Sequence, residues 1–350
     1  MVSHGTGGAQ DHLAPENERT VGLWGRIRLA LRGLVARVMP WLLVPLGMSG
    51  GSRWPAAAAR GSREDKYDVT IAMLTRDAGP VLGRLLDAVF GQETDLTFEV
   101  LAIDSGSTDE TLDTLGQYPV RLITVPKESF NWGRTREFAY ENAQAPVVVN
   151  LSQDAVPMHP TWLDKLVGPL EDPAVGASSG SSLPDPERAF RQFPWERNGY
   201  FYFTQEIQKW IARYGRGLSF ANCAVPRAVW EQLHFDWQPT GEDFQFQQKL
   251  HGAGFRIAFP DDAPVLHHHN YSLRGLFRRC RNEGFALRTM GCAYNEVDLV
   301  QDLLSPRKFV QWLREVKRGD LRTPADLAFP VLRPLAVYTG SRFARKPVWY

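Results

Sequence analysis

Cysteine is scarce in this chain, and long apolar runs are missing. The three cysteines, Cys223, Cys280 and Cys292, show no metal-ligand spacing, which argues against a disulfide scaffold and favours a reducing, cytoplasmic setting. No stretch of about 18 apolar residues occurs, so a conventional membrane-spanning helix is not expected. The composition is 43% hydrophobic and 23% charged, and these values exclude a disordered or fibrous chain.

Acidic side chains are missing from a long N-terminal stretch. Eight arginines and no acid lie between Glu18 and Glu64, and residues 306–350 hold ten Lys or Arg against three Asp or Glu. Residues 1–18 carry three acids and no Lys or Arg, so a net charge of +1 for the whole chain leaves −11 for residues 64–305. Basic ends on an acidic body favour an anionic membrane surface over nucleic acid as the partner.

The basic segment 19–48 has the periodicity of an amphipathic helix. At about 100° per residue, its apolar side chains fall in one sector and its arginines fall outside that sector. The sector holds Leu23, Trp24, Ile27, Leu31, Leu34, Val35, Val38 and Leu42. This pattern is typical of a helix at a membrane surface, and the alternative is a helix packed on its own domain. Residues 1–18 are predicted to be a disordered tail and residues 49–66 a linker.

Strand-like and helix-like segments alternate from residue 67 onward. The expected strands are 68–75, 98–103, 120–125 and 146–151, and the expected helices are 80–90, 108–115 and 133–143. This alternation predicts an α/β fold with a Rossmann-like, mostly parallel sheet flanked by helices. Helical spacing at 273–287 and 303–316 predicts a basic helical region over residues 271–350, after a domain at 67–270.

Polar residues follow three of the expected strands, where ligands bind to such sheets. They are Thr75 to Asp77, Asp104 to Asp109 (DSGSTD) and Ser152 to Asp154. A carboxylate at a strand end can accept a hydrogen bond from a base or a ribose, although DSGSTD also fits a well-capped turn. Asp154 is a candidate ligand for Mg²⁺ or Mn²⁺, although its segment also fits an ordinary turn.

Two further clusters lie between residues 241 and 271. Glu242 and Asp243 open an expected helix at 244–250, where two acids can act in chemistry or serve only as capping groups. Short strands are expected at 255–259 and 263–267, followed by His267, His268 and His269. In extended backbone His267 and His269 share one face, so both could bind one metal ion. A structural role for the three histidines is the alternative. The aromatic-rich segment 190–214 fits sugar stacking or a membrane interface, and core packing beside the sheet is the alternative.

The order of these segments resembles the family-two inverting glycosyltransferases of the GT-A fold, in particular their bacterial rhamnosyltransferase-like branch. The segments are DVTIAMLT, DSGSTD, FNWGRTREFA, NLSQDAVP, FANCAVPRAVW and GED…AFPDDAPVLHHHNY. The resemblance covers residues 67–285. Residues 67–270 would then be the catalytic domain, with helical extensions on both sides.

The resemblance implies roles for individual residues. Thr75, Asp77, Asp104 and Ser105 would surround the base and ribose of a nucleotide. Arg136, in the segment FNWGRTR, would reach the diphosphate.

The resemblance also implies a metal site and a general base. Asp154, with His267 or His269, would bind a divalent cation, Mg²⁺ or Mn²⁺, and Asp243 would be the general base. Three positions depart from the family pattern. Gln153 leaves one carboxylate where many relatives have two, Trp132 stands where the branch often has His, and Arg76 stands where relatives often have an aromatic.

The implied function is the inverting transfer of a sugar from dTDP-rhamnose or a UDP-sugar. The resemblance to the rhamnosyltransferase-like branch implies that this sugar is rhamnose. The acceptor would be a hydroxyl of a glycan or a lipid-linked molecule in cell-surface polysaccharide or glycolipid synthesis, at the inner face of the plasma membrane. A sugar nucleotidyltransferase usually has a Gly-rich phosphate loop with Lys near the first strand, and neither is present. A non-catalytic, membrane-associated carbohydrate-binding protein would not need Asp154, Asp243 and the His pair together.

Overall fold

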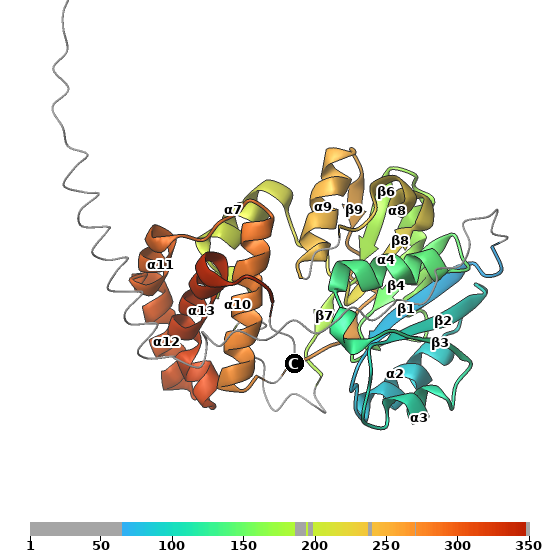
Figure 1. The fold of residues 1–350 in the computed structure, drawn as a ribbon, viewed down its shortest axis with the longest axis horizontal. Helices are drawn as coiled ribbons and strands as arrows, with labels where there is room; N and C mark the ends of the chain where they lie inside the picture. The colour runs from blue at the N-terminus through green and yellow to red at the C-terminus, as the bar shows by residue number, and fades with distance from the viewer. Residues whose placement is uncertain (1–64, 186–193, 195–198, 237–239, 270, 348–350) are drawn as a thin grey trace, which may run out of the picture. The chain divides into compact units, whose positions relative to one another are not determined.

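Four short apolar strands form the parallel half of a seven-stranded sheet (Figure 1). They are β1 (Val69–Thr75), β2 (Phe98–Asp104), β3 (Val120–Thr124) and β4 (Val147–Leu151). β1 pairs with β2 and β4, and β2 pairs with β3, all in parallel. The register sets Thr75 beside Asp104, so two of the predicted polar strand ends are direct neighbours.

The other half of the sheet is mixed. β8 (Asn222–Pro226) lies antiparallel to both β4 and β6 (Val175–Ser179), and β9 (Arg256–Ala258) completes the order β3-β2-β1-β4-β8-β6-β9. A second, small sheet has the order β5-β10-β7. Its strands are β5 (Val156–Pro157), β10 (Val265–Leu266) and β7 (Ser182–Leu183). Leu266 pairs with Val156 there, which brings the segment after β10 close to the end of β4.

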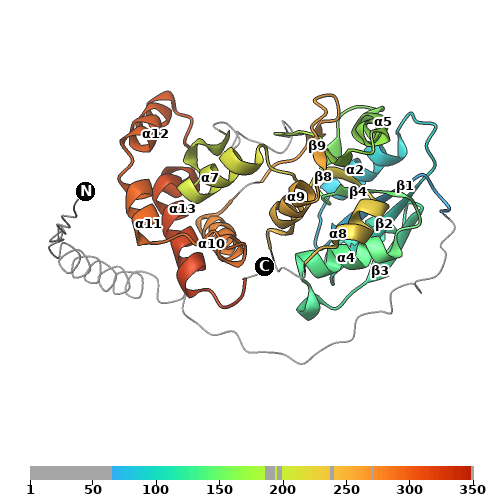
Figure 2. The same cartoon turned by 90° about the horizontal axis from the view of Figure 1, so that it is seen from above.

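Helices cover both faces of the large sheet. Figure 2 shows α2 and α5 on one side of it, and α4 and α8 on the other. The helices around the large sheet include α2 (Val81–Phe90), α3 (Thr111–Leu115), α4 (Trp132–Asn142), α5 (Trp162–Val167), α8 (Arg227–Leu233) and α9 (Glu242–Gly252). This arrangement confirms the predicted α/β class with its mostly parallel sheet.

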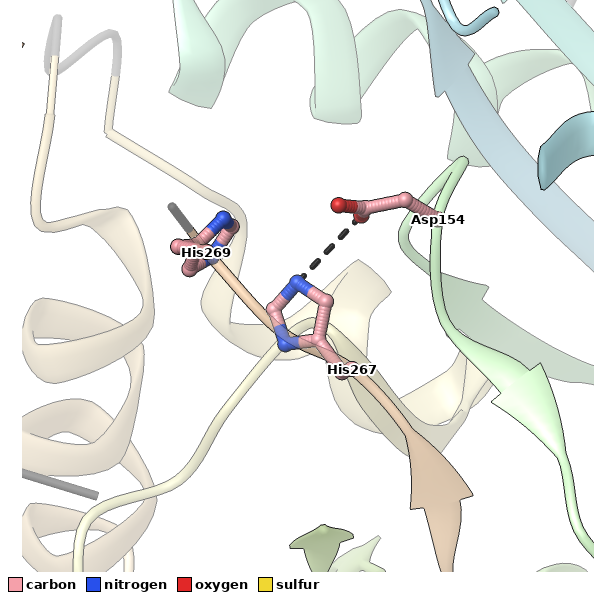
Figure 3. Close-up of side chains that lie close together, drawn as sticks. All are labelled: Asp154, His267 and His269. Atoms are coloured by element: carbon pink, nitrogen blue, oxygen red, sulfur yellow. Dashed lines mark ion pairs between the residues drawn. The ribbon is translucent and has the colours of Figure 1, made fainter. Parts of the chain in front are cut away.

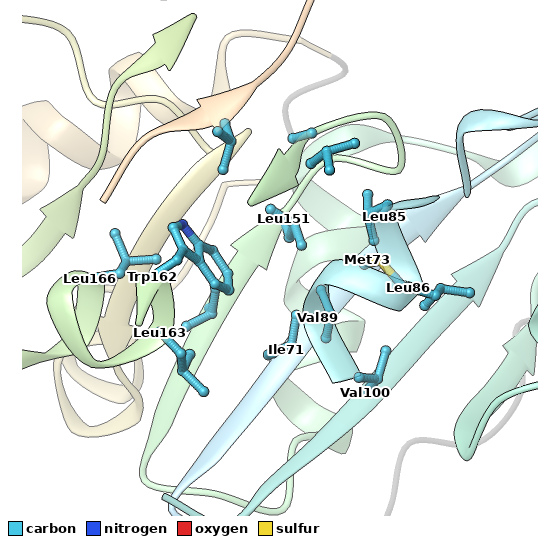
Figure 4. Close-up of a cluster of buried hydrophobic side chains, with 14 of the residues drawn as sticks. Ile71, Met73, Leu85, Leu86, Val89, Val100, Leu151, Trp162, Leu163 and Leu166 are labelled. Carbon is cyan, nitrogen blue, oxygen red and sulfur yellow. The ribbon is translucent and has the colours of Figure 1, made fainter. Parts of the chain in front are cut away.

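Alternating strand residues divide the core into two clusters. Ile71 and Met73 of β1 belong to one cluster with Leu85, Leu86 and Val89 of α2 and with Trp162 of α5 (Figure 4). Leu101 and its neighbours on the opposite face pack against α4, α8 and Phe246 of α9. Successive side chains of a strand point to opposite faces of the sheet. These strands carry apolar side chains on both faces, so the sheet is stable only when helices cover both.

The structure, a computed structural model, describes residues 65–185, 194, 199–236, 240–269 and 271–347. The predicted tail at 1–18, the amphipathic segment at 19–48 and nearly all of the linker at 49–66 lie outside these residues. The described residues fall in one compact unit, so the boundary expected between residues 270 and 271 stays a prediction. Within this part of the chain, no helix has the length and apolarity needed to span a bilayer.

The C-terminal region is helical, as expected, but its segmentation differs from the prediction. Its helices are α10 (Leu273–Thr289), α11 (Glu296–Leu303), α12 (Pro306–Arg318) and α13 (Pro324–Phe343). The helix expected at 303–316 starts instead at Pro306. Ser305 caps it by accepting the Lys308 N–H, and a proline in the first turn has no intrahelical donor to lose.

The aromatic-rich segment contributes packing. An unpredicted helix, α7 (Gln205–Tyr214), buries Trp210 edge-on against Phe244 at 4.7 Å between ring centroids. Tyr202 is buried against Phe329 of α13. For these two side chains, core packing is the interpretation that the structure supports.

Two glycines let α10 and α13 approach closely. A Cβ on Gly284 would collide with the backbone carbonyl of Val337, and one on Gly340 would collide with that of Arg281. Both obstacles are backbone atoms, which cannot move away without shifting a helix. The close packing of α10 against α13 therefore requires residues without a Cβ at positions 284 and 340.

We expect Gly284→Ala and Gly340→Ala each to lower the free energy of unfolding by about 1–3 kcal/mol, the usual cost of overpacking. The measurement is the midpoint of thermal unfolding. Gly252→Ala is the matched control, because a Cβ added there would meet no atom within 4 Å and alanine is the better helix former. Equal midpoints for all three variants would show that the helices can separate without loss.

Candidate active site at the strand ends

The ends of β1 and β2 are joined by hydrogen bonds around Asp104. Its carboxylate accepts from the Thr75 hydroxyl at 3.1 Å, from the backbone N–H of Gly106 at 2.9 Å and from that of Ser107 at 3.0 Å. The Ser105 N–H donates to the Thr75 carbonyl at 2.9 Å. Gly106 has φ +84°, a conformation that a side chain would strain. The Ser107 hydroxyl also donates to the Asp104 carboxylate at 2.5 Å, and these four donors already occupy both oxygens of this buried side chain.

Asp77 connects the same two loops from the other direction. It has a φ of 44°, unusual for a residue with a side chain. Its carboxylate accepts the Thr108 N–H at 2.7 Å, and its own N–H donates to the Ser107 hydroxyl at 3.0 Å. The Asp77 side chain is 43% exposed. Of Thr75, Asp77, Asp104 and Ser105, Asp77 is therefore the one whose carboxylate is open to a ligand.

Gln153 joins the end of β1 to the end of β4. Its side-chain oxygen accepts the Arg76 N–H at 2.7 Å, and its NH₂ group donates to the Arg76 carbonyl at 3.0 Å. A carboxylate can accept but cannot donate, so an acid here would lose the second bond. This pairing gives a physical reason for the departure from the two-carboxylate pattern. Gln153 holds the loop and leaves Asp154 as the acid of this segment.

Asp154, His267 and His269 converge at the junction of the two sheets (Figure 3). Asp154 Oδ1 lies 3.3 Å from His267 Nε2, and the two imidazole centroids are 4.4 Å apart. One ligand atom from each of the three residues lies within 4.8 Å of the others. His268 is buried and lies outside this group. The pairing of β5 with β10 produces this convergence, since Asp154 precedes β5 and the histidines follow β10.

The protonation state of His269 suits metal binding. Burial by the surrounding protein lowers the pKa of His269 to about 3. Its imidazole is therefore neutral at physiological pH, and a neutral ring nitrogen is what a metal ion requires. One carboxylate and two imidazoles, all partly exposed, fit a divalent cation with mixed oxygen and nitrogen ligands.

Asp243 occupies the first turn of α9. Gly241 precedes the helix in the left-handed conformation, with φ +79°, and the Asp243 carboxylate accepts the Phe244 N–H at 2.9 Å. Burial by the surrounding protein and the negative charge of Glu242 raise the pKa of Asp243 to about 7. A carboxyl group with this pKa can accept a proton near neutral pH and release it again.

Arg136 is buried near Asp243 in contacts with protein groups. Its guanidinium donates to Asn150 Oδ1 at 2.8 Å and to Glu242 Oε1 at 3.1 Å, and it lies 4.5 Å from the centroid of Phe220. Arg136 and Glu242 are both nearly inaccessible to solvent. This geometry argues against direct contact between Arg136 and a diphosphate. It shows instead a buried ion pair that joins α4 and β4 to the start of α9.

Arg279 on α10 is a candidate that sequence reasoning missed. Its side chain is exposed, and its positive charge lowers the pKa of both Asp243 and His269. It is therefore close enough to act electrostatically on the two groups. The only sequence signal was the cluster of arginines in α10, and nothing in that cluster singles out position 279.

Comparisons with known proteins agree with this fold. The family model Glycosyl transferase family 2 matches residues 70–233. The O-antigen chain rhamnosyltransferase RfbN of Salmonella typhimurium is 30% identical over 226 residues, which cover 62% of this chain and 71% of that protein. The O-antigen chain rhamnosyltransferase WbaN of Salmonella anatum is 28% identical over 224 residues, covering 61% and 70%.

Solved structures show the same fold at low sequence identity. The mannosyltransferase PcManGT of Pyrobaculum calidifontis, solved with GDP-Man and Mn²⁺, is 18% identical, covers 93% of this chain and 98% of its own, and has a TM-score of 0.54. Glucosyl-3-phosphoglycerate synthase of Mycobacterium tuberculosis, solved with Mg²⁺ and UDP, is 16% identical, covers 66% and 82%, and has a TM-score of 0.52. With its RfbN relative and its GT-A architecture, the chain belongs to glycosyltransferase family 2.

Proposed function

We propose that this protein transfers rhamnose from a nucleoside diphosphate donor to a hydroxyl acceptor, with inversion at the anomeric carbon. The observation that carries the proposal is that two groups lie close enough to Arg279 for its charge to lower a pKa in each of them. One is Asp243, with a pKa near 7, and the other is the cluster of Asp154, His267 and His269. The rhamnosyltransferase relatives support rhamnose as the sugar.

The reaction has two electrostatic demands. The leaving diphosphate gains negative charge, and the attacking hydroxyl must lose a proton. Asp243 takes that proton while the acceptor oxygen attacks from the face opposite the diphosphate, so one displacement inverts the centre. A divalent cation at Asp154, His267 and His269 would supply positive charge against the diphosphate. Arg279 is exposed and would add a second positive charge, the role that the resemblance implies for Arg136.

The nucleotide is proposed to lie against the ends of β1 and β2. Asp77 supplies the accessible carboxylate there, while Thr75, Asp104 and Ser105 hold the two loops in register. We favour dTDP-rhamnose as donor, with a UDP-sugar as the alternative, and a glycan or lipid-linked acceptor. The proposed location is the cytoplasmic face of an anionic membrane, with residues 19–48 as one membrane-binding segment and no nucleic-acid partner.

One assay separates this proposal from its rivals. Incubation with dTDP-rhamnose, UDP-sugars and Mn²⁺ should release the nucleoside diphosphate. A sugar nucleotidyltransferase would instead release diphosphate from a nucleoside triphosphate and a sugar phosphate, and a carbohydrate-binding protein would release nothing. Family membership already favours the transferase.

Replacing the proposed base should separate binding from catalysis. We expect Asp243→Asn to keep donor affinity and to lower the transfer rate by about 10²–10⁴-fold, the usual contribution of a general base. Isothermal titration gives the first quantity and product formation the second. Asp113→Asn, an exposed residue of α3, is the matched control. Near-normal turnover by a folded Asp243→Asn protein would remove Asp243 from this role.

The pH profile tests the electrostatic environment of Asp243. A base with pKa near 7 makes kcat/KM rise with pH through that value, because only the ionised form accepts a proton. Glu242→Gln removes a neighbouring negative charge and leaves Arg136 unneutralised. Both effects lower the pKa of Asp243, so the rising limb should move to lower pH. An unmoved limb would mean that another group titrates.

Metal dependence can be measured without turnover. Asp154→Ala, His267→Ala and His269→Ala should each weaken binding of the nucleoside diphosphate in the presence of Mn²⁺, because each removes one ligand. His159→Ala, an exposed histidine, should bind like the wild type. If EDTA leaves wild-type binding unchanged, the metal proposal fails and Arg279 must carry the leaving group.

A further inference from the structure

Helix α12 is oriented with its apolar side chains toward solvent. Phe309, Val310, Leu313 and Val316 are all exposed, with Phe309 at 58% of its full surface. The positions that α12 buries are polar, Lys308 at 8% and Glu315 at 1% exposure. A helix on a protein surface normally shows the reverse arrangement, because burial of apolar area is what stabilises it there.

Specific bonds hold this orientation. Lys308 Nζ donates to Asp302 of α11 at 2.7 Å and to the backbone carbonyl of Phe203 at 3.2 Å. Rotating α12 to bury its apolar face would expel a lysine from a buried ion pair and leave Asp302 unneutralised. The outward direction of the apolar face is therefore built into the packing of α11 and α12.

The apolar surface continues beyond α12. Leu304, just before the helix, is 74% exposed, and Leu327 and Val331 of α13 are also exposed. Trp312 Nε1 donates to the Leu327 carbonyl at 3.1 Å, so these parts of α12 and α13 are adjacent. We call the exposed apolar residues of α12 and of the adjacent part of α13 the α12 apolar face; it consists of Phe309, Val310, Leu313, Val316, Leu327 and Val331. A group of exposed apolar side chains on adjacent helices is typical of an interaction site.

Positive charge borders this face. Arg307, Arg314, Lys317 and Arg318 are exposed on α12, and at about 100° per residue they fall on one side of it. The single acid of α12, Glu315, is buried. The face therefore presents aliphatic and aromatic groups next to cations, with no exposed carboxylate on the same helix.

We propose that the α12 apolar face docks on anionic lipid, with the helix lying in the plane of the membrane surface. Anionic headgroups complement the four cations, and the acyl region accepts Phe309 and its neighbours. A second copy of this chain fits less well, because a two-fold contact through this face would oppose its own cations. The inference deepens the membrane partner named in the proposed function and rests on that part of it.

The test is vesicle flotation of the full chain, with vesicles of phosphatidylcholine alone or mixed with phosphatidylglycerol. Phe309→Gln with Leu313→Gln should weaken binding to the anionic vesicles by about tenfold or more, at both low and high salt, because apolar insertion is not screened. Lys317→Gln with Arg318→Gln should weaken binding by about fivefold or more, and mainly at low salt.

Matched controls come from the sheet region. Leu112→Gln with Leu122→Gln removes two similarly exposed leucines, and Lys165→Gln with Arg256→Gln removes two exposed cations. Both pairs should float like the wild type. A third full-length variant, Leu31→Asp with Leu34→Asp, measures the contribution of residues 19–48 separately.

Three results would overturn the inference. The first is a wild type that does not bind anionic vesicles. The second is an α12 pair that floats like the wild type while the Leu31 and Leu34 pair does not. The third is a wild-type dimer in light scattering that Phe309→Gln with Leu313→Gln converts to monomer, which would assign the face to a second copy. Release of nucleoside diphosphate from soluble donor should stay unchanged in the α12 variants, so failure of the proposed chemistry and failure of lipid binding give different readouts.

Discussion

The buried ion pair between Arg136 and Glu242 is the contact on which the candidate site depends. It connects three elements: α4 through Arg136, β4 through Asn150, and the N-terminus of α9 through Glu242. Without the arginine, the buried carboxylate of Glu242 would lie next to Asp243 with its ion-pair partner removed. Burial is the largest cause of the raised pKa of Asp243, the negative charge of Glu242 adds to it, and the positive charge of Arg136 acts in the opposite direction. The ion pair therefore fixes the position of the proposed base, whereas the raised pKa of Asp243 comes mainly from its burial.

The rest of the site is assembled by backbone pairing rather than by side-chain affinity. Parallel pairing of β1 with β2 places Thr75 beside Asp104, and pairing of β5 with β10 carries the histidines to Asp154. Gln153 then joins the loop after β4 to the loop after β1, because its side chain hydrogen-bonds to both the backbone N–H and the carbonyl of Arg76. Three loops that belong to different strands are thus hydrogen-bonded to one another, and an arrangement that is already formed lowers the cost of ordering the protein when a ligand binds. This is why the acids in this arrangement can serve different purposes: Asp104 organises the loop, while Asp77 and Asp154 stay partly open.

Local patterns predicted some of this arrangement and could not predict the rest. Strand texture placed the polar residues at strand ends, and the period of two placed His267 and His269 on one face, because both are properties of consecutive residues. The partner of Arg136 lies 106 positions away, so only the fold shows that this arginine is buried rather than facing a diphosphate. Arg279 was missed for the same reason. The start of α12 was misplaced because apolar spacing runs through Leu303 and Leu304, whereas the cap at Ser305 and Pro306 decides where the helix begins.

The periodicity of a sequence also cannot predict whether the apolar side of an amphipathic helix faces the protein or the solvent. The pattern of residues 306–318 predicts one apolar and one polar side, and the ordinary expectation is that the apolar side packs inward. Asp302 reverses this, because a buried carboxylate needs a cation and Lys308 is within reach on the polar side of α12. One ion pair therefore turns Phe309 and Leu313 toward the surroundings. α13, whose Leu327 borders that face, packs through Gly340 against α10, the helix that carries Arg279. The helices that present the apolar face and the helix that contributes a charge to the site thus form one packed group, so a surface that binds lipid and a site that acts on a lipid-linked acceptor would share the same support.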